Sequence, residues 1–165
     1  MRYTALLVAA LVCLVLVSDT GLSQNTANQT LSFSVAAIAR ITVSGSPAPL
    51  TITAGTPGTD ALTPVSNALT TYSITHNSNS PLQITAALDE NMPSGTKLEI
   101  SLASSKGSGG STVDITSAAA TAVPVVTSIT RGADANRAIT YTFSADASAG
   151  AMSSFNRTVT LTLTN

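Results

Sequence analysis

The side chains that most often carry out catalysis are scarce in this chain. His76 is the single histidine and Cys13 the single cysteine. A hydrolytic triad would pair His76 with a serine and an acid, but the Gly-x-Ser-x-Gly sequence that often presents a nucleophilic serine is absent. His76 shares its parity with Tyr72 and Ile74 and precedes the turn-forming residues 77–80. We therefore interpret it as a strand-end histidine and predict no catalytic residue and no enzyme; a secreted hydrolase built around His76 is the alternative.

Oxygen donors that could bind a hard cation cluster at two places. Zinc needs three or four Cys, His or carboxylate ligands, which one histidine cannot supply. Calcium binds carboxylate and carbonyl oxygens, and Asp89, Glu90 and Asn91 place such groups at a strand-to-turn junction. Asp134 and Asn136 form a second, smaller group. Neither has the spacing of a calcium-binding loop, so we interpret both as polar turns, keep Asp89–Asn91 as the candidate metal site, and predict no cofactor.

Other ligand classes lack their usual binding groups. Seven Lys and Arg against eight Asp and Glu give a net charge of −1, and no basic stripe is present to bind nucleic acid. The glycine-rich residues 107–110 lack the pattern of a phosphate-binding loop. Sugar-binding sandwiches commonly stack sugars on exposed rings, but this chain has no Trp, and Tyr72, Tyr141, Phe33 and Phe143 lie on apolar strand faces that predict core positions. Phe155, in the last connection, is the one remaining ring.

The N-terminal residues have the pattern of a secretory signal peptide. Arg2 is followed by the apolar run Ala5–Val17, and small residues precede a cleavage site between Ser23 and Gln24. The apolar run is shorter than the roughly 20 residues of a membrane span. Cys13 lies inside the run, so the exported chain has no cysteine and no disulfide. We expect residues 1–23 to be removed and the protein to be secreted, either periplasmic or at the cell surface.

Apolar residues at every second position predict β-strands through the rest of the chain. The first such segment is long: it runs from Leu31 to Val43, with Ile38 out of phase, which suggests a bulge near residues 36–39. The same alternation predicts further strands at residues 50–54, 72–76, 82–88, 98–102, 123–129, 139–143 and 159–163. No segment has helical periodicity, and residues 104–111 are a flexible loop.

Seven to ten strands separated by turn residues predict an all-β fold. We expect residues 24–165 to form a single antiparallel, two-sheet, Ig-like β-sandwich. The Trp and Cys landmarks of antibody domains are absent, so the term describes architecture only.

The C-terminal segments resemble a known group of secreted domains. Residues 139–145, Ala149-Gly150 and residues 157–163 form a Thr-rich strand, a small-residue turn and a final alternating strand. This pattern resembles bacterial pilin-like and spore-coat-protein-U-like domains. The resemblance implies an Ig-like sandwich and a role as a fibre subunit, adhesin or coat component. The chain departs from those families in lacking a disulfide and an aromatic residue near its C-terminus.

The first alternating segment gives an independent reason to expect assembly. Leu31, Phe33, Val35 and Ala37 share one parity. Such a strand is either an edge strand of its own sheet or a donor strand that adds to a neighbour's exposed edge. We therefore predict an exported, non-enzymatic structural or surface-interaction protein whose partners are copies of itself or other surface proteins, bound through strand edges. The alternative is a secreted module that binds carbohydrate or a hard cation such as calcium.

Overall fold

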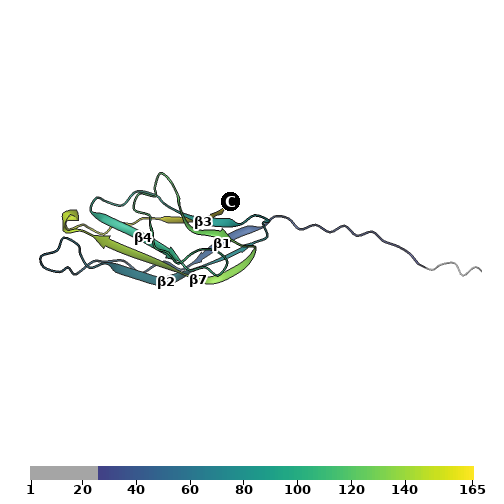
Figure 1. Cartoon of the computed structure of the whole chain (residues 1–165), viewed down its shortest axis with the longest axis horizontal. Helices are drawn as coiled ribbons and strands as arrows, with labels where there is room; N and C mark the ends of the chain where they lie inside the picture. The colour runs from purple at the N-terminus through teal and green to yellow at the C-terminus, as the bar shows by residue number, and fades with distance from the viewer. Residues whose placement is uncertain (1–25) are drawn as a thin grey trace, which may run out of the picture. The chain divides into compact units, whose positions relative to one another are not determined.

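The computed structural model describes residues 26–165 and consists of two antiparallel sheets packed face to face (Figure 1). The predicted all-β sandwich is therefore confirmed. The compact unit that holds both sheets comprises Val35–Asn165, while residues 26–34 belong to a separate N-terminal unit. The expected signal peptide, with its cleavage site at Ser23 and Gln24, lies outside the described residues. Among residues 26–165, no helix is long and apolar enough to cross a membrane.

The larger sheet has five strands in the order β1-β2-β7-β4-β5. Its members are β1 (Ala39–Ser44), β2 (Val65–His76), β4 (Thr96–Leu102), β5 (Val113–Asp114) and β7 (Gly132–Ala145). The long strands β2 and β7 pair along most of their length and form its centre (Figure 1). Strands β1 and β5 are therefore its two edges.

The smaller sheet has three strands in the order β6-β3-β8. They are β6 (Val123–Ile129), β3 (Leu82–Leu88) and β8 (Val159–Thr164), with a short 3-10 helix, η1 (Ala147–Ala149), between β7 and β8. Alternation fixes which side chains of β3 enter the core: Leu82, Ile84, Ala86 and Leu88 are buried, and the residues between them are not. Strand β8 pairs only with β3, so its other edge is unpaired in the described structure.

Aliphatic side chains from both sheets, together with Tyr72 and Tyr141, form one core. The fully buried residues include Ile84 and Val126 of the smaller sheet and Ile100, Leu102 and Ile139 of the larger. Their strands carry β-branched and leucine side chains at alternate positions, which is the pattern that lets two pleated faces interdigitate. With no cysteine in the described residues, burial of these side chains supplies the stability.

Two expected strands are shorter than the sequence pattern predicted. The alternating segment Leu31–Val43 forms a strand only from Ala39 onward, so the prediction of a strand over Leu31–Ile38 is wrong. Residues 50–54 form no strand either, although Leu50 packs against the core. Alternation marks a chain that is able to pair, but a strand also needs a neighbouring backbone to hydrogen-bond.

A close approach of two backbones makes Gly107 a position that no larger residue fits. A Cβ atom at Gly107 would lie 2.6 Å from the carbonyl oxygen of Thr127 and 2.9 Å from Cγ1 of Ile129. We predict that Gly107→Ala lowers the free energy of unfolding by about 1–3 kcal/mol through overpacking. Gly55→Ala is the matched control, because its Cβ would meet only the flexible end of Leu62, at 3.0 Å. Urea unfolding checks both variants, and equal losses would contradict the prediction.

Candidate functional site

His76 is the last residue of β2, as the sequence pattern indicated, and its imidazole is buried. The residue is 2% exposed, and its Nε2 lies 3.0 Å from the carbonyl oxygen of Thr130. Because a carbonyl oxygen only accepts, Nε2 carries the proton, and the buried Nδ1 is left without a hydrogen-bond partner. A catalytic base must reach its substrate, whereas this side chain joins the end of β2 to the residue after β6. Its position gives it a structural role.

The three candidate calcium ligands are engaged in separate internal contacts. Oδ1 of Asp89 accepts hydrogen bonds from the backbone N–H of Thr158 at 2.9 Å and of Glu90 at 3.0 Å. The bond from Thr158 is the main cause that lowers the pKa of the Asp89 carboxyl group. Glu90 forms an ion pair with Arg157, and Asn91 accepts a bond from the N–H of Ala119. These contacts attach the segment before β8 to the end of β3.

The second candidate cation group is not a turn. Asp134 lies within β7 and its side chain is fully buried, so the interpretation of a polar turn is wrong for this residue. Its carboxylate accepts hydrogen bonds from Ser104 Oγ at 3.1 Å, from Ser105 N at 2.7 Å and from Ser105 Oγ at 2.9 Å, and it pairs with Arg137. Within residues 26–165, no three His, Cys, Asp or Glu side chains converge on a point where they could hold a metal ion.

The Asp134 contacts set the position of the loop that follows β4. Ser104 and Ser105 begin this loop, and three residues later Ser108 exchanges backbone hydrogen bonds with Thr127 of β6, at 2.8 and 3.0 Å. Thr130 donates to the carbonyl oxygen of Lys106 at 2.8 Å. The predicted flexible loop therefore runs along the outer edge of β6 and occupies part of its backbone hydrogen-bonding capacity.

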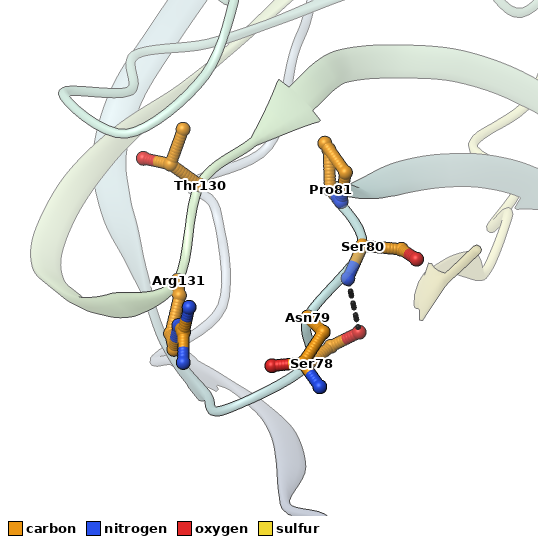
Figure 2. Close-up of a pocket in the computed structure, with 6 residues that line it drawn as sticks. All are labelled: Ser78, Asn79, Ser80, Pro81, Thr130 and Arg131. Atoms are coloured by element: carbon orange, nitrogen blue, oxygen red, sulfur yellow. Dashed lines mark hydrogen bonds between the residues drawn. The ribbon is translucent and has the colours of Figure 1, made fainter.

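A shallow pocket lies between the β2–β3 turn and the residues after β6 (Figure 2). It has a volume of about 310 Å³ and is lined by Ser78, Asn79, Ser80, Pro81, Thr130 and Arg131. Figure 2 shows the Ser80 N–H directed at the hydroxyl of Ser78, a bond of 3.2 Å. The lining offers one cation, no carboxylate and no aromatic ring, so it has neither an acid–base pair nor a stacking surface for a sugar.

The aromatic residues divide differently from the prediction. Tyr72 and Tyr141 are buried as expected. Phe33 is 89% exposed, so its predicted core position is wrong. Phe155 is exposed, but its ring packs edge-on against Phe143, with centroids 6.4 Å apart, and the Arg157 guanidinium lies 5.1 Å from its centre. The ring predicted to be free is thus part of the packing that precedes β8.

The segment before β1 carries large apolar side chains that are open to solvent. Leu31 is 66% exposed, Phe33 89% and Val35 85%, and Ala37 is exposed as well. No residue from 26 to 38 belongs to a strand or helix. Isolated surface hydrophobics are ordinary, but three at period two on an unpaired backbone are typical of a strand whose partner is elsewhere.

Asn77 fixes the last residues of this segment to the sandwich. Its Oδ1 accepts the N–H of Ile38 at 2.7 Å, its backbone N–H donates to the carbonyl of Ile38 at 3.0 Å, and its Nδ2 donates to the carbonyl of Ala36 at 2.8 Å. Nothing in the sequence singled out Asn77 beyond its turn propensity. These three bonds define the direction in which the chain enters β1.

An apolar strip is left partly uncovered where β1 and β8 approach each other at one side of the sandwich. On β8, Val159, Leu161 and Leu163 pair with the core positions of β3 and are only partly buried. On β1, Ile41 pairs with Ile74 and Val43 with Tyr72, so both face the core side, yet Val43 is 50% exposed. The cause is the unequal size of the sheets, because the three-stranded sheet has no strand beyond β8 to cover β1.

Comparison with protein-family models, with curated proteins and with solved structures finds no significant match to this chain.

Proposed function

We propose that this protein is an exported, non-enzymatic structural subunit that associates with copies of itself by strand addition. The observation that carries the proposal is the donor segment, residues 31–37, with Leu31, Phe33 and Val35 exposed and no strand partner among the described residues. The signal-peptide pattern and the resemblance to pilin-like and coat-protein domains agree with such a role. Assembly at a surface outside the cytoplasm then follows from export.

The driving force for association is the burial of the donor segment's apolar face. Covering one large aliphatic or aromatic side chain stabilises a complex by about 1.5–3 kcal/mol, before the cost of ordering the chain. The backbone of a donor segment also needs hydrogen-bond partners, which an unpaired strand edge provides. Both requirements are met by one partner, a sheet edge flanked by apolar side chains.

Light scattering of the purified chain from residue 24 onward tests this function. We expect oligomers that grow with protein concentration. Replacing Leu31, Phe33 and Val35 together by threonine keeps β propensity but removes the apolar face, and this triple variant is expected to be a folded monomer. The matched control changes the opposite parity, with Ser32→Thr and Ser34→Thr, and is expected to assemble normally. A wild-type chain that stays monomeric at all concentrations, or a triple variant that still assembles, would overturn the proposal.

A further inference from the structure

We infer that the donor segment of one copy binds along the unpaired edge of β8 of a second copy, antiparallel to β8. The acceptor is the β8 groove, defined by Val159, Leu161 and Leu163 of β8 and by Ile41 and Val43 of β1. This inference rests on the proposed function and adds the site, the direction and the register of the contact.

The other strand edges are less able to accept a strand. Strand β5 has only two residues. The outer edge of β6 is occupied at Thr127 by Ser108, and Pro124 in the same strand has no backbone N–H. Strand β1 has a free edge, but a strand added there would extend the five-stranded sheet further past its three-stranded partner. Its inward side chains would then face no opposing sheet.

A strand beside β8 corrects the inequality between the sheets. It would extend the three-stranded sheet to four strands, on the side where β1 and β8 approach each other. Its core-side face would then lie over Ile41 and Val43, whose exposure is the consequence of the missing cover. Backbone pairing and apolar burial therefore coincide at this edge and at no other edge of the described sandwich.

The spacing of the two strands defines the register. Three alternate apolar residues on the donor segment match three on β8, and at about 3.4 Å per residue both stretches are roughly 14 Å long. We assign Leu31 opposite Leu163, Phe33 opposite Leu161, and Val35 opposite Val159. This register uses only residues that precede the contacts of Ala36 and Ile38 with Asn77, so the donor keeps those contacts.

The direction follows from where the chain enters β1. The entry residues Val35–Ala39 and the end of β8 line one hollow, together with Asn77, Leu82 and Asn165. A parallel donor would bring its own sandwich to this end, where the acceptor's donor segment leaves. An antiparallel donor brings its sandwich to the opposite end, near Val159, and leaves the acceptor's own segment free for another copy.

Insertion into the chain's own groove requires a reversal that Asn77 opposes. To run antiparallel to its own β8, the donor segment would have to lead into β1 from the far end of the groove, whereas Ala36 and Ile38 are held at the near end. The contact is therefore between copies. Because the donor and acceptor surfaces differ, the interface is heterologous, and repetition without closure gives a linear filament.

Cysteine cross-linking tests the site, because residues 24–165 contain no cysteine. In the assigned register Ser34 lies opposite Thr160 on the outward face. We expect the Ser34→Cys, Thr160→Cys double variant to form a ladder of disulfide-linked oligomers on mild oxidation, as closely opposed Cβ atoms allow. The control pair, Ser34→Cys with Thr127→Cys on the β6 edge, is expected to give dimers at most, like Ser34→Cys alone.

The outcomes separate this inference from the proposed function. A ladder from the Thr127 pair and none from the Thr160 pair, in a chain that assembles by light scattering, would overturn the β8 site and leave strand addition intact. A faster ladder from Ser34→Cys with Thr162→Cys would overturn the register. Linked monomers, in which both cysteines of one chain join, would show insertion into the chain's own groove and overturn the contact between copies. Loss of all assembly in the wild type overturns both proposals.

Discussion

Replacing Asp134 by alanine is expected to lower the free energy of unfolding by about 3 kcal/mol, because it removes a buried carboxylate that organises four donors. Ser105 N–H, the two serine hydroxyls and the Arg137 guanidinium would lose their acceptor. Arg137 is partly exposed and can turn to water, which keeps the loss below that of a fully buried pair. Urea unfolding in the monomeric Leu31, Phe33 and Val35 triple variant measures the effect without interference from assembly.

Glu99→Ala provides the control for a general effect of removing a carboxylate. Glu99 pairs with Lys97, whose side chain is 46% exposed, so we expect a loss below about 1 kcal/mol. Losing Asp134 should also release the loop from Ser104 to Ser108 and uncover the edge of β6, which makes this variant more prone to aggregate. Equal losses for the two variants would show that the buried network contributes nothing special.

The same network makes the fold sensitive to acid in a defined range. Burial alone raises the pKa of Asp134, but the hydrogen bonds from Ser105, Arg137 and Ser104 outweigh it and lower the pKa to about 2. A carboxyl group whose pKa is lower in the folded state stabilises the fold above its unfolded pKa of about 3.9, and that contribution disappears as the pH falls toward 2. In Asp134→Asn the decline in stability between pH 4 and 2 is expected to be shallower by roughly 2 kcal/mol. Parallel declines would contradict this assignment.

A second large effect is expected when the donor strand is supplied within the same chain. The fusion removes residues 24–34 and adds, after Asn165, one glycine followed by a second copy of residues 30–37. Asn165 and the added glycine form the Asn-Gly pair that favours a tight type I′ hairpin turn. With a two-residue turn, Leu31 of the copy falls opposite Leu163, which is the assigned antiparallel register. The fusion is expected to be a monomer.

Burial of the copied side chains in the β8 groove is expected to raise the midpoint of thermal unfolding by about 5–10 °C over the monomeric triple variant. A fusion whose copied Leu31, Phe33 and Val35 are all threonine is the control, and we expect no rise for it. Scanning calorimetry together with light scattering makes the comparison. An unchanged midpoint in the apolar fusion would contradict the β8 groove as the acceptor.

Alternation in the sequence determined most of the fold. Strand β3 shows why: Leu82, Ile84, Ala86 and Leu88 stand at every second position, and a pleated backbone places all four on one face. The same local rule identified β4, β6, β8 and the central part of β2. The scarcity of histidine and cysteine likewise limits the chemistry open to the chain, whatever its fold.

Only the tertiary structure decided which strand edges are paired. Leu31 and Ile41 belong to one alternating segment, yet Ile41 lies in β1 and Leu31 is exposed, because pairing depends on a backbone that is distant in sequence. Asp134 looked like part of a turn and is a buried anchor, since its partners are about 30 residues earlier. The free edge of β8 follows from strand order, which alternation does not encode, because a period of two specifies a face and not a neighbour.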